Sequence, residues 1–215
     1  MKKMSEVLKV SGLEKRYPAF HLENVGFTLE KGRIMGFIGR NGAGKTTTLK
    51  ALLSLIHPDG GQIRFFGMDY EGSERQIRQR VGFASGGVNY YPRKKLKDIT
   101  AVTKRFYDSW DEDAYRACLK AFALDEEKKP MELSEGMKVK YNLAVALSHK
   151  AELLILTSRP AAWIRFPATN CWRSSWIWQR QAPRSSSPRI SPPIWRSART
   201  ISLTSRTERS GKAAA

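Results

Sequence analysis

The chain has 215 residues, of which 41% are hydrophobic and 27% are charged, and it carries a formal net charge of +18. This length and composition are typical of a globular chain that can bury a core as one large domain or two small ones. The sequence has no apolar run near the roughly 20 residues that span a bilayer, and no apolar stretch follows the basic amino terminus. We therefore expect neither an integral membrane protein nor a secreted one. The two cysteines, Cys118 and Cys171, fit no metal or disulfide spacing and suit a reducing cytoplasm.

The charge is distributed unevenly and divides the chain after Leu156. Residues 1–156 hold 27 Lys and Arg against 19 Asp and Glu, a net +8, whereas residues 157–215 hold 11 against one, a net +10. The first part mixes β-rich runs, amphipathic stretches and turn residues, as an α/β protein does. The second part holds five of the six tryptophans, six of the ten prolines and 11 serines, with neither a helical nor a strand period. We expect this tail to be irregular and poorly ordered.

The first element with a chemical signature is the segment from Leu13 to Tyr17. It is rich enough in β-forming residues to present the aromatic ring of Tyr17 at the end of a strand. An aromatic ring in this place could stack on adenine if a nucleotide binds beside it.

A glycine-rich loop follows the apolar run at residues 33–38, which predicts a buried strand, and precedes a predicted helix at 46–55. The loop fits the P-loop pattern G-x-x-x-x-G-K-[ST] in the strand–loop–helix context that this pattern requires. Its glycines let backbone N–H groups converge on phosphate oxygens, and the helix amino terminus adds a positive dipole. Lys45 would reach the β and γ phosphates, and the Thr46 hydroxyl would bind Mg²⁺. The candidate nucleotide-binding residues are Tyr17, Gly39, Arg40, Asn41, Gly42, Ala43, Gly44, Lys45, Thr46 and Thr47.

Three further segments complete the folded part. Residues 97–124 are helical in pattern. The aromatic side chains of this helical stretch have core spacing; they are Phe106, Tyr107 and Trp110. Residues 137–149 predict an amphipathic helix with Ser134 at its start, and the helix runs into the apolar strand Leu153–Leu156.

The run Leu133-Ser134-Glu135-Gly136-Met137 begins 88 residues after Lys45 and resembles the LSGGQ signature of ATP-binding cassette (ABC) transporters. P-loop, signature and hydrophobic strand also occur in that family's order, and residues 58–63 resemble the turn and strand that follow the P-loop helix in these proteins. The resemblance implies an α/β fold of the P-loop NTPase type, with a RecA-like core, an antiparallel β region and an α-helical subdomain at about residues 90–140. It further implies that two such subunits face each other head to tail. Ser134 and the backbone of Gly136 would then hold the γ-phosphate bound at the partner's P-loop.

The same resemblance implies what the chain does and with what. The cofactors would be ATP and Mg²⁺. The partners would be a second ATP-binding subunit, identical or different, and a membrane-spanning transporter subunit contacted by the helical subdomain. The chain would lie in the cytoplasm, peripherally on the inner face of the cell membrane, and would drive export of the bacterial ABC-2 or antibiotic type. The alternative is a soluble ABC-type ATPase that acts on ribosomes or nucleic acid. The modest charge of residues 1–156 and the single cassette favour the transporter, so no specific nucleic-acid partner is expected.

The sequence departs from the family's pattern at residues that would perform the chemistry. Gly86 stands where the family usually has glutamine. Thr157 and Ser158 follow the apolar strand, where the family has an aspartate that helps to hold Mg²⁺ and a glutamate that activates water. The interface aspartate and the later γ-phosphate histidine are also missing, so none of the family's catalytic residues is present. We expect hydrolysis close to background.

Three explanations of residues 157–215 stay open: a basic arm that binds nucleic acid, a disordered linker, or translation in the wrong reading frame. If one G is supplied at the junction of Leu156 and Thr157, the shifted reading permits DE, GLD and STH in the family's order. On this interpretation residues 1–156 are an incomplete ABC nucleotide-binding domain. The tail is then an out-of-frame product without a selected function.

Overall fold

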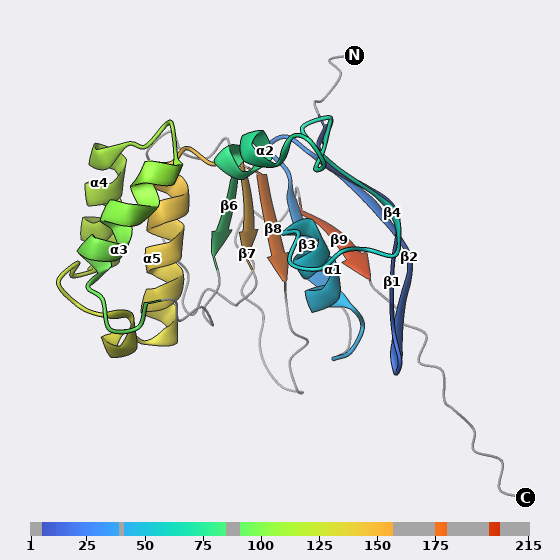
Figure 1. The fold of residues 1–215 in the computed structure, drawn as a ribbon, viewed down its shortest axis with the longest axis horizontal. Coiled ribbons are helices and arrows are strands. Elements are labelled where there is room, and N and C mark those ends of the chain that lie inside the picture. The colour runs from blue at the N-terminus through green and yellow to red at the C-terminus, as the bar shows by residue number, and fades with distance from the viewer. Residues whose placement is uncertain (1–5, 39–40, 85–90, 157–174, 180–197, 203–215) are drawn as a thin grey trace, which may run out of the picture.

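The computed structural model describes residues 6–38, 41–84 and 91–156, together with the backbone of two strands at residues 175–179 and 198–202. Figure 1 shows a group of helices, a central sheet of parallel strands and a second sheet of long antiparallel strands. Strands and helices alternate along much of the chain, and the fold is of the predicted α/β class.

The antiparallel sheet has the strand order β2-β1-β4-β5. Its strands are β1 (Glu6–Tyr17), β2 (Phe20–Glu30), β4 (Gly60–Phe65) and β5 (Met68–Asp69). The long strands β1 and β4 approach each other very closely at Gly12 and Gly61, which have φ angles of +60° and +87°. A Cβ atom on Gly61 would lie 2.3 Å from the carbonyl oxygen of Gly12. Only glycine fits at position 61, because any side chain there would overlap the neighbouring backbone, and both glycines adopt the left-handed conformation that glycine favours.

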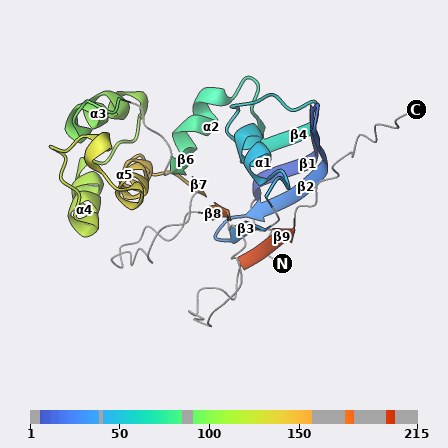
Figure 2. The same cartoon turned by 90° about the horizontal axis from the view of Figure 1, so that it is seen from below.

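The second sheet is parallel, with the order β6-β7-β8-β3-β9. Its strands are β3 (Ile34–Ile38), β6 (Val81–Ala84), β7 (Leu153–Leu156), β8 (Ser175–Gln179) and β9 (Ala198–Ser202). Every residue of β7 is buried, as expected for an inner strand of a parallel sheet. Figure 2 shows the five strands following one another between the helices and the antiparallel sheet.

The prediction of an irregular tail is wrong for the residues that form β8 and β9. Strand β8 pairs with β7 on one side and β3 on the other, and β9 pairs with the free edge of β3. The physical reason is that β8 contains Trp176, Ile177 and Trp178, residue types that favour strands. Its partners lie far away in the sequence, so a search for local periodicity could not detect the pairing. Residues 157–174, 180–197 and 203–215, for which poor order was also predicted, lie outside the described residues.

Helix α1 (Lys45–Leu52) lies between the two sheets (Figures 1 and 2). It ends three residues before the predicted boundary, because Ser54 adopts a left-handed conformation with φ +54°. The short helix α2 (Glu74–Arg80) leads into β6. Buried side chains of α1, α2 and both sheets form one apolar core, which we call the sheet cluster; it includes Leu8, Phe37, Leu49, Leu52, Phe65, Ile77 and Ile155.

The remaining helices form the predicted helical subdomain beside β6. They are α3 (Leu96–Thr103), α4 (Glu112–Phe122) and α5 (Glu135–Ser148), with 3₁₀ turns at Lys104–Phe106 and Pro130–Glu132. The helical pattern predicted over residues 97–124 is therefore broken into two helices. Tyr107 leaves the helix and stacks on His149, with ring centroids 3.9 Å apart, and Asp111 caps α4 by accepting from the N–H of Ala114 at 2.9 Å. The core assignment is wrong for Phe106, which is 72% exposed, whereas Tyr107 and Trp110 are partly buried.

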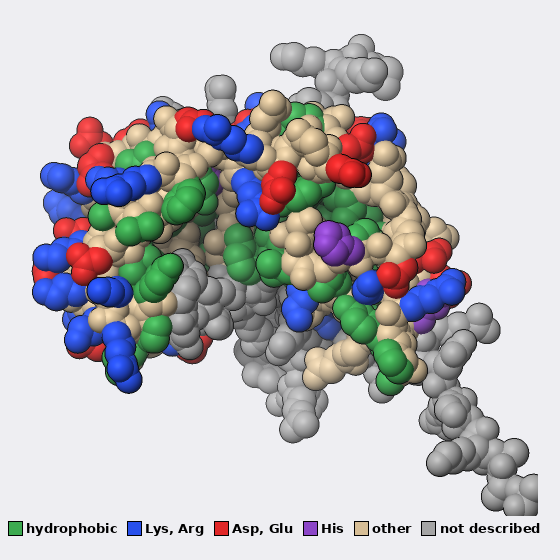
Figure 3. Space-filling model, viewed as in Figure 1, with side chains coloured by type: hydrophobic (Ala, Val, Ile, Leu, Met, Phe, Trp, Pro, Cys, Tyr) green, Lys and Arg blue, Asp and Glu red, His purple; other side chains and the backbone are tan. Residues whose placement is uncertain are grey.

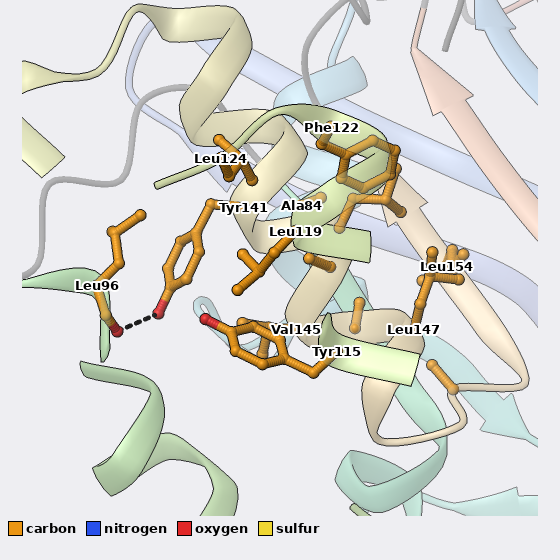
Figure 4. Close-up of a cluster of buried hydrophobic side chains, with 14 of the residues drawn as sticks. Ala84, Leu96, Tyr115, Leu119, Phe122, Leu124, Tyr141, Val145, Leu147 and Leu154 are labelled. Carbon is orange, nitrogen blue, oxygen red and sulfur yellow. Dashed lines mark hydrogen bonds between the residues drawn. The ribbon is translucent and has the colours of Figure 1, made fainter. Parts of the chain in front are cut away.

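The inside of the helical subdomain is a second core, which we call the helical cluster. It includes Ala84, Leu96, Tyr115, Leu119, Phe122, Tyr141, Leu147 and Leu154. The Thr100 hydroxyl is hydrogen-bonded to the hydroxyls of both Tyr115 and Tyr141, each at 2.8 Å, and Figure 4 shows the Tyr141 hydroxyl donating to the carbonyl of Leu96. Burial raises the pKa of Tyr115 to about 12. This cluster therefore contains a hydrogen-bonded set of hydroxyls among its apolar side chains.

Candidate functional site

The glycine-rich loop connects β3 to α1, and the structure describes it from Asn41 onward; Gly39 and Arg40 lie outside the described residues. Gly42 and Gly44 have φ angles of +82° and +88°. A Cβ atom on Gly44 would lie 2.5 Å from Leu22 Cδ1 and 3.1 Å from Phe20 Cζ. Gly44 is therefore required twice, by its left-handed backbone and by its contact with the β1–β2 hairpin.

The start of α1 has the properties of an anion site. Lys45 is the first helical residue and is only 5% exposed, Thr46 is exposed, and Thr47 is half-buried. Thr48 uses its hydroxyl on the carbonyl of Gly44 at 3.0 Å. In the described part of the loop and helix, no side chain caps the amino terminus of α1, as is also true of α2 and α3. Helix α1 differs from the other helices in having no acidic residue in its first turn, whereas α2, α3, α4 and α5 each have at least one there. The residues present fit a phosphate group, because an uncapped helix start keeps N–H donors and a positive dipole for an anion.

The aromatic side chain predicted beside the loop is Tyr17, the last residue of β1. It is 43% exposed and pairs with Phe20 across the hairpin, with ring centroids 6.3 Å apart. Phe20 in turn lies against Gly44. The hairpin thus places the accessible ring of Tyr17 beside Phe20, which itself contacts the loop.

A residue that the sequence analysis treated only as part of a turn, Asp59, holds the same hairpin from its other side. Its carboxylate accepts from Lys15 Nζ and from the backbone N–H of Arg16, each at 2.7 Å. The hydrogen bond from Lys15, followed by that from Arg16, lowers the pKa of Asp59 below its usual value. The sequence signal was limited to an aspartate before Gly60-Gly61, which is typical of turns.

The signature-like segment lies at the start of α5. Ser134 is the N-cap residue, and its hydroxyl accepts from the N–H of Met137 at 3.3 Å. The helix therefore begins at Glu135, two residues before the predicted boundary. Ser134 is exposed and Gly136 is half-buried. Strands β6, β7 and β8 lie between α5 and α1 in Figures 1 and 2, so one chain does not bring this segment and Lys45 together.

A cavity of about 360 Å³ lies where the helical subdomain meets the sheets. Its walls come from the end of α1, from α2, β6, α3 and the second half of α5, and include Leu52, Tyr70, Arg78, Phe83, Tyr107 and His149. His149 donates from Nδ1 to the carbonyl of Gln79 at 3.2 Å, and burial lowers the pKa of His149 to about 4.

Figure 3 shows hydrophobic side chains gathered between the two parts of the molecule and charges of both signs over the helices. The apolar side chains of Val102 and Phe106 are exposed on α3 and on the turn after it.

The positions that would carry catalysis, Thr157 and Ser158 after β7, lie outside the described residues, and so does Gly86. Within the ranges that the structure describes, no group of three or more His, Cys, Asp or Glu side chains gathers as a metal site. The same ranges contain no helix that is long and apolar enough to cross a membrane.

Solved structures of ABC ATPases share this fold. The structure of an ATP-binding subunit of an ABC transporter superimposes with a TM-score of 0.69 at 22% identity, covering 81% of this chain and 79% of that one. CbiO1 of Clostridium perfringens, part of the ABC transporter complex CbiONQ, gives a TM-score of 0.61 at 19% identity, covering 81% and 78%.

Relatives in sequence are transport ATP-binding proteins. The bacitracin transport ATP-binding protein BcrA of Bacillus licheniformis is 33% identical over 156 residues, which are 71% of this chain and 51% of that protein. The Nod factor export ATP-binding protein I of Burkholderia orbicola (strain AU 1054) is 38% identical over 151 residues, 67% of this chain and 49% of that protein. The chain spans about half the length of these curated relatives. Residues 22–157 match the family described as ABC transporter, and the chain therefore belongs to the ABC transporter family through its ATP-binding domain.

Proposed function

We propose that this chain is the ATP-binding subunit of an exporter and that it couples ATP to the movement of a substrate through a membrane-spanning partner. The observation that carries the proposal is the uncapped start of α1, with Lys45 as its first residue and two left-handed glycines before it. Similar chains are named for bacitracin transport and for Nod factor export, which favours an exporter over an ATPase that acts on ribosomes or nucleic acid.

The nucleotide would be bound by the predicted residues of the loop. The backbone of residues 39–44 would surround the phosphates, Lys45 and Thr47 would contact their oxygens, and Tyr17 would stack on the base. Thr46, whose side chain is exposed at the helix start, would be a ligand of Mg²⁺. When bound, Mg²⁺ would offset phosphate charge.

A second ATP-binding subunit, identical or related, would complete the site. Ser134 is exposed and caps α5, so its hydroxyl and the backbone of Gly136 are accessible to a facing subunit. Since β6, β7 and β8 lie between the start of α5 and the start of α1 within one chain (Figures 1 and 2), a nucleotide at Lys45 would need the signature segment of a partner.

The membrane-spanning partner would contact the helical subdomain. Val102 and Phe106 are exposed, and each is the sequence neighbour of a residue that lines the cavity, Thr103 or Tyr107. Exposed apolar side chains favour contact with another chain. The chain would then lie in the cytoplasm, on the inner face of the membrane, without a specific nucleic-acid partner.

Hydrolysis by the chain as written would stay close to background, because Thr157 and Ser158 stand where the family has an aspartate and a glutamate. We further propose that residues 1–156 are an incomplete nucleotide-binding domain and that residues 157–215 are read out of frame. Steady-state ATPase rates of this chain and of a chain with the reading frame restored would test both points. A rate within a few-fold of the restored chain would contradict them.

Nucleotide binding itself is tested by titrating the full chain with Mg-ATP and following the heat of binding. Lys45→Ala should weaken ATP binding roughly 10- to 100-fold, because hydrogen bonds to charged groups contribute about 1.5–3 kcal/mol. Lys50→Ala is the matched control, since Lys50 is an exposed lysine at the other end of α1. Equal ATP affinity of both variants and the original chain would refute the proposed site.

The alternative function predicts a different partner. A transporter subunit should sediment with membranes that contain its partner, and Phe106→Asp should release it. An ATPase acting on RNA should instead be retained on RNA and lose this affinity steeply as salt rises.

A further inference from the structure

The β1–β2 hairpin extends beyond the strand that supports it. Strand β1 pairs with β2 as far as Tyr17 and Phe20, but its ladder with β4 ends at Glu14 and Gly60. Residues 15–17 therefore have a strand on one edge only. Tyr17 is the last residue of this extension, so its position depends on what holds the other edge.

Asp59 occupies that other edge. Its N–H donates to the carbonyl of Glu14 at 2.9 Å, and its two carboxylate oxygens accept from the backbone N–H of Arg16 and from Lys15 Nζ, each at 2.7 Å. The side chain of Asp59 thus continues the ladder past the point where β4 ends. These are short bonds to a charged acceptor, which are stronger than bonds between neutral groups.

Lys15 connects Asp59 to the aromatic ring. Its side chain is only 19% exposed, and its Nζ lies 5.9 Å from the centroid of the Tyr17 ring. That distance is within the range of a cation–π contact. The ring therefore lies between Lys15, which is held by Asp59, and Phe20, which lies against Gly44 of the loop.

We infer that Asp59 is a positioning residue for the base of the nucleotide: it holds Lys15 and Arg16, and through them the ring of Tyr17, beside the phosphate loop. This inference rests on the proposed function, because it assumes that Tyr17 receives the base. Without Asp59, the end of the hairpin has to be ordered when the base binds, and that ordering opposes binding.

Asp59 should affect binding of the base but not binding of the phosphates. Lys45 and the glycines of the loop have no contact with Asp59 among those described, whereas Tyr17 is linked to it through Lys15. Asp59→Ala should therefore weaken Mg-ATP binding about tenfold and leave the affinity for inorganic tripolyphosphate unchanged, since losing contacts worth about 1.4 kcal/mol changes an affinity tenfold. A merely structural role would lower both affinities together.

The experiment measures both affinities by titration calorimetry on the full chain and on four single variants. Asp59→Asn keeps an acceptor for the Arg16 N–H but loses the charge that pairs with Lys15, so its ATP affinity should be intermediate. Tyr17→Ala should have the same selective defect as Asp59→Ala. Asp69→Ala is the matched control, because Asp69 is an exposed aspartate of the same sheet that pairs with Arg64 at 3.0 Å, away from the hairpin end; it should bind as the original chain does.

The double variant Tyr17→Ala/Asp59→Ala gives the sharpest comparison. If Asp59 acts through Tyr17, removing Asp59 after Tyr17 should cost no further ATP affinity, whereas independent effects would add. Additive losses, or an equal loss of tripolyphosphate affinity, would overturn the inference.

If Asp59→Ala does not fold, Asp59→Asn alone tests the inference. An unchanged ratio of ATP affinity to tripolyphosphate affinity in Asp59→Asn would then contradict the inference. An original chain that binds neither probe would refute the proposed function and this inference together. Binding of both probes with no effect at Asp59 refutes only the inference.

Discussion

The sheet cluster and the helical cluster are stabilised in different ways. In the sheet cluster, the buried ring of Phe37 packs edge-to-face on the partly buried ring of Phe27, with ring centroids 5.2 Å apart. Of the six buried polar or charged side chains in the described part of the chain, only Lys45 and Thr48, both on α1, belong to the sheet region. The other four lie in the helical subdomain, and they are Thr100, Asn142, Ser148 and His149.

The two regions should therefore respond differently to pH. The free energy gained by apolar burial depends on the area removed from water and changes little with pH. The free energy contributed by buried hydroxyls and a buried imidazole depends on their hydrogen-bond partners and, for the imidazole, on its protonation. The region that carries the phosphate loop should therefore tolerate changes of pH that loosen the region carrying Ser134.

The largest expected effect is in the sheet cluster. Phe37 is fully buried on β3, and Phe37→Ala should lower the free energy of unfolding by about 3–5 kcal/mol, because it removes a ring and leaves a cavity. Urea unfolding followed by circular dichroism would measure it. Phe106→Ala removes the same side chain from an exposed position and should change stability little; equal losses in both variants would contradict the assignment of the core.

The next effect is a pH dependence located in the helical subdomain. The pKa of His149 is about 4 in the folded chain against an ordinary value of 6.5. Below pH 6.5 the imidazole of His149 therefore binds a proton in the unfolded chain but not in the folded chain. The free energy of unfolding should fall as the pH drops from 6.5 toward 4. The loss is on the order of 3 kcal/mol over that window.

This pH dependence can be assigned to one residue by comparing variants. The midpoint of thermal unfolding, measured between pH 7.5 and 4.5, should fall less steeply for His149→Asn than for the original chain. His57→Asn changes an exposed histidine after α1 and should keep the original slope. Identical slopes in all three chains would show that His149 does not contribute.

The smallest effect concerns the buried hydroxyls. Thr100→Val preserves shape but removes the group that both Tyr115 and Tyr141 contact, which should cost about 1–2 kcal/mol. Amide hydrogen exchange should then speed up in α3 and α5 more than in β1 and β2. Thr103→Val, which removes a bond within one helix, is the control, and uniform acceleration throughout the chain would contradict a local effect.

Elements with strong local signals could be predicted from the sequence. The apolar runs of β3 and β7 and the glycine pattern before Lys45 each carry their own evidence, and Ser134 caps α5 as its residue type suggests. The boundaries at Leu52 and Glu135 differ from the predictions by two or three residues, because helix ends depend on single residues such as Ser54 and on cap geometry.

The features that sequence reasoning missed depend on contacts between distant residues. The break at Tyr107 comes from its stack on His149, and the role of Asp59 comes from a partner 43 residues earlier. Gly82 shows the same dependence: a Cβ atom there would lie 2.6 Å from Leu154 and 2.7 Å from Ala146. No pattern within a short window identifies such neighbours.

The position of β3 has a consequence for how the chain assembles during synthesis. In the parallel sheet, β3 has β8 and β9 as its two neighbours, and both follow Leu156 along the chain. A growing polypeptide that has emerged only as far as Leu156 can join β6 to β7, but β3 then has two unpaired edges. The strand that precedes the phosphate loop therefore gains its neighbours only after β8 and β9 have been synthesised.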